Sequence, residues 1–268
     1  MSKSIKNFFY AKNISDVLYQ INSIQDLEIL GGCTQINEYP ENSLSIRKIP
    51  ELSEIKKTER FFEFGPAVTI SRIEELQNAK LPSIIQKAIK TIANKNIRNM
   101  ATIGGNICSK PIKHTLFAPL LALDTRLIIR NSTEEKIILL NNINEIPKNW
   151  IISKIRIPLD EWEVSIFRRL GPSNIINENS ASFAFLANSQ KGQLANLRIA
   201  FAGSICIRSQ ELENKLIGTH LPLSEKNIIE TLEDASMYFD TIASEKKINS
   251  ILKAQFLNLL KYSLEQLT

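Results

Sequence analysis

The stretch RNMATIGGNIC, residues 98–108, decides how this chain is interpreted, because a helical pattern ends there and two adjacent glycines follow. Glycine lacks a Cβ atom, so Gly104 and Gly105 let a ligand lie against backbone and give access to positive φ. We therefore expect a tight polar turn in which the N–H groups of both glycines and of Asn106 converge on an anion. Thr102 adds a hydroxyl. An ordinary loop turn is the alternative interpretation of a glycine pair.

A second glycine pair occurs earlier, in EILGGCTQI, residues 28–36. An apolar strand-like run ends at Gly31 and Gly32 and passes into Cys33, Thr34 and Gln35. Two such pairs, each following a regular element, predict two walls of one site. Neither pair fits the GxGxxG fingerprint, and no GxxxxGK[ST] occurs, so a Rossmann fold and a P-loop are not supported.

The pair LGGCTQ and IRNMATIGGNI resembles the two pyrophosphate-binding loops of the FAD subunit of the molybdenum hydroxylases, which include the xanthine dehydrogenase and carbon monoxide dehydrogenase medium subunits. The family pattern reads roughly AGGTD and then IxxxQIRNxGTIGGNI, and NKNIRNMATIGGNI matches the second part almost letter for letter. The GPAVT turn, the APLLALDTRL run and the RIAFAG segment also fit. The resemblance covers essentially the whole chain, strongly at the two loops and weakly at the C-terminus.

Length and composition fit a globular protein of two or three compact units, with 268 residues, 43% apolar and 23% charged. No apolar run reaches the roughly 18 residues of a membrane span, and the N-terminal MSKSIKNFF lacks the apolar core of a signal peptide. We therefore expect a cytoplasmic protein without a membrane partner. The net charge is +5, yet lysines are scattered among glutamates, which favours a solvated surface over nucleic-acid binding.

Metal-ligating residues are sparse in the sequence. The three cysteines, Cys33, Cys108 and Cys206, lie far apart without a CxxC spacing, so we expect free thiols. Three thiolates cannot hold an iron–sulfur cluster, which needs four, and only His114 and His220 could add imidazole ligands to a zinc site. We expect no metal site in this chain, so any metal chemistry must come from a partner.

The hydrophobic pattern predicts an α+β chain in three parts. Residues 1–53 form a first lobe, with a strand at 8–10, a helix at 14–21 capped by Asn13 or Ser15, and a strand running into the first glycine pair. Residues 54–159 form a second lobe. Its predicted elements are a strand at 61–64, a helix at 70–77 capped by Thr69, a helix opened by Pro82 with an apolar stripe from Leu81 to Ile92, a helix at 117–123, and a hairpin of 126–130 with 136–140.

Residues 160–268 form the third part, in which strands precede helices. The predicted strands are 164–169, 182–187 and 197–202, and the predicted helices are 210–216, 225–238 and 248–264. The resemblance implies that residues 1–159 are the two-lobed FAD-binding domain of the PCMH or vanillyl-alcohol-oxidase type. It also implies that residues 160–268 are the family's C-terminal sheet-plus-helices α+β domain.

The resemblance implies non-covalent FAD as the cofactor, because a flavin brings its own redox centre and the protein only holds and tunes it. It assigns no catalytic side chain. Ile152 would pack on the adenine, Ile92 and Ile103 would lie nearer the flavin ring, and Arg168 would be the basic residue that approaches the flavin. The residues assigned to the cofactor are Leu30, Gly31, Gly32, Cys33, Thr34, Gln35, Ile92, Ala101, Thr102, Ile103, Gly104, Gly105, Asn106, His114, Ile152 and Arg168.

Two positions depart from the family pattern. Cys33-Thr34 replaces the usual Thr-Asp, and losing a carboxylate beside a pyrophosphate is electrostatically harmless. Cys33 is better interpreted as an inert thiol than as a covalent flavin link. His114 stands where the family has an aspartate that binds sugar or ribityl hydroxyls, and one imidazole cannot supply a carboxylate's pair of acceptors.

The resemblance implies an FAD-carrying electron-transfer subunit of a molybdenum hydroxylase, similar to xanthine dehydrogenase. It would pass electrons from a partner's iron–sulfur clusters to NAD+ or another acceptor. The implied partners are a [2Fe–2S] small subunit and a molybdopterin large subunit. Two alternatives are a stand-alone flavin oxidoreductase of the same fold, for which no substrate base is evident, and a non-redox scaffold that has lost FAD. The His114 change favours the scaffold, and two intact glycine pairs disfavour it.

Overall fold

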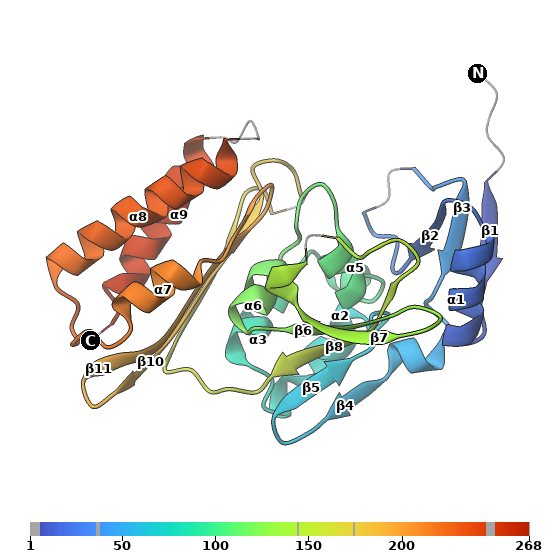
Figure 1. The fold of residues 1–268 in the computed structure, drawn as a ribbon, viewed down its shortest axis with the longest axis horizontal. Coiled ribbons are helices and arrows are strands. Elements are labelled where there is room, and N and C mark those ends of the chain that lie inside the picture. The colour runs from blue at the N-terminus through green and yellow to red at the C-terminus, as the bar shows by residue number, and fades with distance from the viewer. Residues whose placement is uncertain (1–5, 36–37, 144, 174, 245–249, 268) are drawn as a thin grey trace. The chain divides into compact units, whose positions relative to one another are not determined.

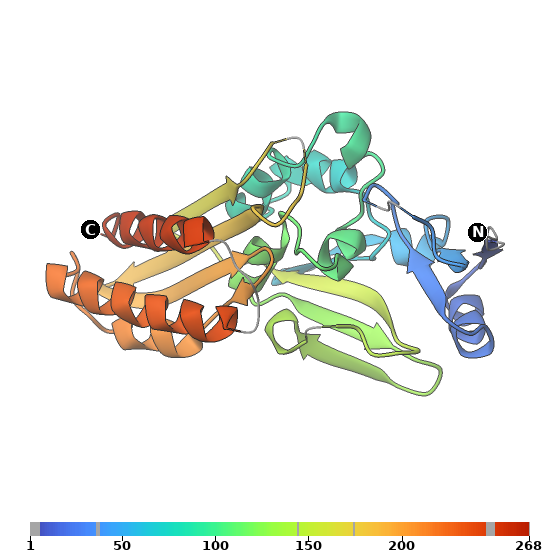
Figure 2. The same ribbon diagram turned by 90° about the horizontal axis from the view of Figure 1, so that it is seen from above.

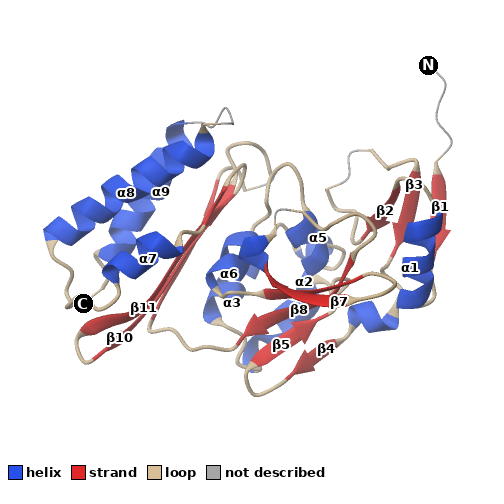
Figure 3. Cartoon of the chain, viewed as in Figure 1, coloured by secondary structure: helices blue, strands red, loops and turns tan. Residues whose placement is uncertain are grey.

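The computed structural model describes residues 6–35, 38–143, 145–173, 175–244 and 250–267. Helices and strands are mixed along the chain, as expected for an α+β protein (Figure 1, Figure 3). The chain divides into two compact units. Unit 1 contains Met1–Leu81, Ala93–Cys108 and Asp124–Leu159, and unit 2 contains Pro82–Ile92, Ser109–Leu123 and Asp160–Thr268.

A small parallel sheet opens unit 1, in the order β1-β3-β2. Helix α1 packs Val17 and Leu18 into the core around Leu44, and the Asn13 side chain accepts from the N–H of Asp16 at 2.9 Å, so the expected cap is confirmed. The bounds are β1 (Asn7–Tyr10), α1 (Ile14–Ser23), β2 (Leu27–Leu30) and β3 (Asn42–Ser45). Because the strands are parallel, the segments that leave their carboxyl ends emerge at one edge.

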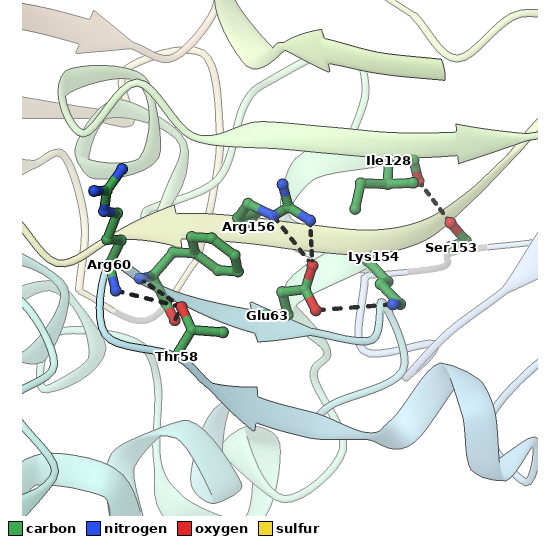
Figure 4. A network of polar contacts seen from close by, with 8 residues as sticks. Thr58, Arg60, Glu63, Ile128, Ser153, Lys154 and Arg156 are labelled. Carbon is green, nitrogen blue, oxygen red and sulfur yellow. Dashed lines mark hydrogen bonds and ion pairs between the residues drawn. The ribbon is translucent and has the colours of Figure 1, made fainter. Parts of the chain in front are cut away.

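A five-stranded antiparallel sheet completes the strands of unit 1, in the order β4-β5-β8-β6-β7. Phe62 and Phe64 are buried, and Glu63 between them belongs to a polar network on this sheet (Figure 4). In it, Arg156 donates to Oε1 of Glu63 from Nε at 3.1 Å and from Nη2 at 2.6 Å. The strands are β4 (Ile55–Lys57), β5 (Phe61–Phe64), β6 (Arg126–Arg130), β7 (Glu135–Leu139) and β8 (Ile151–Pro158).

Short helices connect these strands. The side chain of Thr69 accepts from the N–H of Arg72 at 3.4 Å and caps α2, as expected, but α2 ends at Glu74 and continues as a 3-10 helix. Two helices around the second glycine pair, α4 and α5, were not expected from the sequence. The elements are η1 (Pro50–Ser53), α2 (Ile70–Glu74), η2 (Glu75–Asn78), α4 (Lys95–Arg98), α5 (Ile103–Cys108) and η3 (Leu140–Asn142).

Unit 2 is built on an antiparallel sheet in the order β12-β11-β10-β9 (Figure 2). Lys191 and Gly192 have φ of 54° and 73°, and they form the tight turn between the two longest strands. The strands are β9 (Val164–Leu170), β10 (Ala181–Gln190), β11 (Gln193–Ala202) and β12 (Cys206–Ile207), and the helices are α3 (Ser83–Ile89), α6 (Phe117–Ala122), α7 (Gln210–Leu216), α8 (Glu225–Ala243) and α9 (Ser250–Leu264).

The core of unit 2 is rich in aromatic side chains. The ring of Phe201 lies 5.3 Å from that of Phe256 and 6.2 Å from that of Phe239, and all three are buried. These contacts fix α8 and α9 to β11. The helix expected from Leu81 to Ile92 is shorter than its apolar stripe. It ends at Ile89, where the N–H groups of Thr91 and Ile92 bond to the carbonyls three residues before them.

An ion pair lies within this core. The side chains of Arg208 and Glu213 are 1% and 2% exposed, and Nε lies 2.6 Å from Oε1. Glu213 also accepts from the N–H of Ile199 at 2.8 Å, and Arg208 donates to the carbonyl of Leu121. One charged pair therefore joins α7, β11, α6 and the segment between β12 and α7. No helix in the described ranges combines the length and apolar character needed to cross a membrane.

Candidate functional site

The first glycine pair lies against residues 100–102, the segment that leads into the second pair, in unit 1. A Cβ atom added to Gly32 would stand 1.9 Å from the carbonyl oxygen of Met100 and 2.9 Å from the Cα atom of Ala101. A Cβ atom added to Gly31 would stand 2.7 Å from Oγ1 of Thr102. No side chain fits at either position without separating the segments. The glycines of the first pair thus allow the first loop to contact the second.

The glycines of the two loops do not use the positive φ that this residue type permits. Of the described glycines, those with positive φ are Gly171, Gly192 and Gly218, all in unit 2. In the first loop the left-handed residue is Cys33, with φ of 54°. At Gly31 and Gly32, close approach of the second loop, rather than an unusual dihedral angle, excludes side chains.

The prediction of a tight turn at Gly104 and Gly105 was wrong, since both residues lie in helix α5. The N–H of Gly104 donates to the carbonyl of Pro66 at 3.0 Å, that of Gly105 to Oγ1 of Thr102 at 3.1 Å, and that of Asn106 to the carbonyl of Thr102 at 3.0 Å. These three groups have protein acceptors and do not converge on a free position. The physical reason is that Thr102 pairs with Thr69 and caps the helix through its own hydroxyl.

The site nevertheless offers backbone to a ligand. Gly105 is exposed, and an added Cβ atom would meet only Oγ1 of Thr102, at 3.2 Å. Within the described ranges, no protein acceptor is recorded for the N–H groups of Gly32, Cys33 and Thr34. Bare N–H groups of this kind bind phosphate oxygens. The two loops therefore fit a diphosphate, with the N–H donors coming from the first loop and an open glycine surface from the second.

The charge beside the first loop comes from Arg47, a residue that the sequence analysis did not single out. Burial raises the pKa of the Cys33 thiol, while a hydrogen bond with Tyr39 and the charge of Arg47 act in the opposite direction. The thiol is therefore neutral at pH 7. Arg47 also donates from Nη1 to the sulfur of Met100 at 3.0 Å. Its position two residues after the end of β3, in a parallel sheet, was the signal that could have identified it.

The remaining assigned residues of unit 1 are mostly buried. Ile103 is 1% exposed and donates its N–H to the carbonyl of Val68 at 3.0 Å, so it belongs to the core beneath the loop. Ile152 is 6% exposed and lies opposite Ile129 in the sheet. The other assigned residues that are buried here are Leu30, Ala101, Thr102 and Asn106, and those at least partly exposed are Thr34 and Gln35.

Three assigned residues, Ile92, His114 and Arg168, belong to unit 2. Burial and, to a smaller degree, the charge of Lys113 lower the pKa of His114 to about 4, so its imidazole is neutral at pH 7. The backbone N–H of His114 donates to Oγ of Ser109 at 3.1 Å. Ile92 is buried, and Arg168 is exposed on β9. Their assignment to a cofactor stays a prediction.

Comparisons with known proteins agree with this geometry. The family described as the FAD binding domain in molybdopterin dehydrogenase matches residues 3–160. Abscisic-aldehyde oxidase of Arabidopsis thaliana is 27% identical over 81% of this chain, which spans 19% of that protein. The 6-hydroxypseudooxynicotine dehydrogenase complex subunit alpha of Paenarthrobacter nicotinovorans is 28% identical, with 68% of this chain and 65% of that protein covered.

Solved structures show the same fold over the full chain. Cyanide-inactivated Cu,Mo-CO dehydrogenase superposes with a TM-score of 0.81 at 17% identity, covering 100% of this chain and 99% of that one. Quinoline 2-oxidoreductase from Pseudomonas putida 86 superposes with a TM-score of 0.77 at 16% identity, covering 100% and 96%. The family match covers more than half of the sequence and includes both glycine pairs. The chain therefore belongs to the family of FAD-binding domains of molybdopterin dehydrogenases, which are oxidoreductases.

Proposed function

We propose that this chain is the FAD-carrying electron-transfer subunit of a molybdenum hydroxylase. The observation that carries the proposal is the contact between the two glycine loops, where Gly32 lies directly against the backbone of Met100. This contact places the free N–H groups of the first loop beside the exposed Gly105 of the second. A diphosphate needs several donors from separate segments, and adjacent loops supply them.

Bound FAD would supply the redox chemistry, and the chain would bind and orient it. We assign the diphosphate to Gly32, Cys33 and Thr34 on one side and to Thr102 and Gly105 on the other. The neutral Cys33 thiol adds no negative charge there. Ile152 is assigned to the adenine. By the family resemblance, Ile92 and Ile103 are assigned to the flavin ring, Arg168 to the approach to the flavin, and His114 to the sugar or ribityl hydroxyls.

The partners follow by analogy with relatives. One relative is named as subunit alpha of a dehydrogenase complex, and this chain spans 65% of it. We propose that electrons arrive from a [2Fe–2S] small subunit associated with a molybdopterin large subunit and leave to NAD+ or another acceptor, in the cytoplasm. The division into lobes at residues 1–53 and 54–159 and a C-terminal domain at 160–268 belongs to the same proposal.

The test is purification of the tagged chain under native conditions from the cell that makes it. We expect a flavin absorption spectrum, release of FAD on heating, and iron and molybdenum eluting with the chain in a fixed ratio. FAD without either metal, together with turnover by the isolated chain, would instead indicate a stand-alone flavin oxidoreductase. A colourless chain that gains no flavin on incubation with FAD would contradict the proposal and favour the scaffold.

A further inference from the structure

Arg47 lies beside the place where a ligand of the first loop would bind. It follows β3, and the first glycine pair follows the neighbouring parallel strand β2. The N–H of Ile46 donates to the carbonyl of Leu30 at 3.1 Å, so the pairing of β2 with β3 extends to the residue before Arg47. Ligands of parallel sheets bind outside the carboxyl ends of the strands, which is the edge that carries both segments.

The side chain of Arg47 reaches the seam between the two loops, which is the contact of Gly32 with Met100. Its Nη1 lies 3.0 Å from the sulfur of Met100, and the carbonyl of Met100 is the group that packs against Gly32. A thioether is a weak acceptor, whereas a guanidinium has five N–H donors. Arg47 is exposed, and within the described ranges no ion pair is recorded for it. The guanidinium thus retains most of its donors at this seam.

We propose that Arg47 binds the diphosphate of FAD through its guanidinium, as a charged partner of the N–H groups in the first loop. The inference rests on the proposed function. Guanidinium groups bind phosphate oxygens through two parallel hydrogen bonds, and two ionised partners make these bonds stronger than neutral ones. The charge on Arg47 also offsets one of the two negative charges of the diphosphate, which the neutral N–H donors leave unbalanced. The proximity of Arg47 to Cys33 agrees with this position.

The experiment measures FAD affinity of the full chain after removal of flavin, by fluorescence quenching, for wild type, Arg47→Ala, Arg47→Lys and Lys48→Ala. Lys48 is the matched control, because it is the next residue and an exposed cation. We expect Arg47→Ala to bind FAD about 10- to 100-fold more weakly, since a hydrogen bond to a charged group has that value. Arg47→Lys should recover part of the loss, and Lys48→Ala should bind within about twofold of wild type.

Riboflavin separates a diphosphate contact from a change of fold. It contains the ring system without phosphate, so its binding should be equal in wild type and Arg47→Ala, and the thermal midpoints of the flavin-free proteins should also agree. The salt dependence of FAD binding should weaken in Arg47→Ala. Equal FAD affinity in wild type and Arg47→Ala, or an equal loss in Lys48→Ala, overturns this inference alone. A wild-type chain that binds no FAD overturns the proposed function as well.

Discussion

Four glycines show that one residue type serves different purposes within one site. Gly31, Gly32 and Gly104 are closed in by protein atoms at 2.7, 1.9 and 2.7 Å from an added Cβ atom, whereas Gly105 faces outward. Gly31 and Gly32 let the two loops touch, Gly104 lets the second loop pack on Pro66, and Gly105 leaves room for a ligand. Substitutions in the two classes should therefore have different effects on folding and binding.

We predict that Gly105→Val keeps the fold and loses FAD binding. The added Cβ atom meets only Oγ1 of Thr102, at 3.2 Å, so the backbone can keep its place after a shift of a few tenths of an ångström, whereas the side chain occupies the surface assigned to the diphosphate. The measurement is the flavin content of the purified variant, together with its circular dichroism spectrum.

Gly32→Ala is the matched comparison for this prediction. Its methyl group would stand 1.9 Å from the carbonyl oxygen of Met100, so the two loops must separate and the thermal midpoint should fall together with flavin content. If Gly105→Val retains a full complement of FAD, the assignment of the second glycine pair to the cofactor is wrong.

His114 gives a prediction about pH. Its pKa is about 4 in the folded chain against 6.5 when unperturbed, so between these values the unfolded chain binds more protons. The free energy of unfolding should therefore fall as pH drops from about 7 to about 4, by on the order of 3 kcal/mol, and this group should have little effect above about pH 7.

His114→Gln removes that proton uptake, so the variant should lose less stability than wild type between pH 7.5 and pH 4.5 in urea unfolding. His220→Gln is the control, since His220 is exposed in unit 2. The carboxylates titrate alike in all three proteins and cancel in the comparison. Parallel pH profiles for wild type and His114→Gln would show that His114 is not held neutral by burial.

At the scale of elements, unit 2 depends on the ion pair between Arg208 and Glu213. We predict that Glu213→Ala destabilises the protein by about 3–5 kcal/mol, because it leaves a buried guanidinium without its carboxylate and removes the acceptor of the N–H of Ile199. Lys215 lies on the same helix as Glu213 and forms a more exposed pair with Asp234 of α8, so Lys215→Ala should change stability by about 0.2–1 kcal/mol.

Urea unfolding of both variants tests this prediction, and the double variant Arg208→Met with Glu213→Leu completes it. Apolar side chains of similar volume leave no buried charge, so the double variant should be more stable than Glu213→Ala. A double variant as unstable as the single one would indicate that the hydrogen bonds to Ile199 and Leu121, rather than the charge, hold these elements together.

For the whole molecule, FAD should stabilise the folded chain by mass action. At a free concentration of about 100 times Kd, binding adds about 2.7 kcal/mol, which corresponds to a rise in thermal midpoint of about 5–10 °C for a domain of this size. Differential scanning fluorimetry with increasing FAD, compared with equal concentrations of ATP, tests this. An unchanged midpoint at saturating FAD would argue against a folded-state cofactor site.

Local rules in the sequence determined much of the fold. The caps at Asn13 and Thr69, the hairpin of β6 and β7, and the helix at Gln210–Leu216 were all predicted correctly, because each depends on neighbours within a few residues. The glycine pairs and the RNMATIGGNI pattern also identified the family that the match to residues 3–160 shows.

The tertiary structure decided what the glycines do and which charge lies beside them. A sequence shows that Gly32 lacks a side chain but not that the carbonyl of Met100 occupies the space where one would be. It likewise places Arg47 in a polar stretch, whereas parallel pairing of β2 and β3 brings this cation to the first loop. Both facts depend on contacts between segments far apart in the chain. Residue type and local periodicity depend only on near neighbours, so they do not show such contacts.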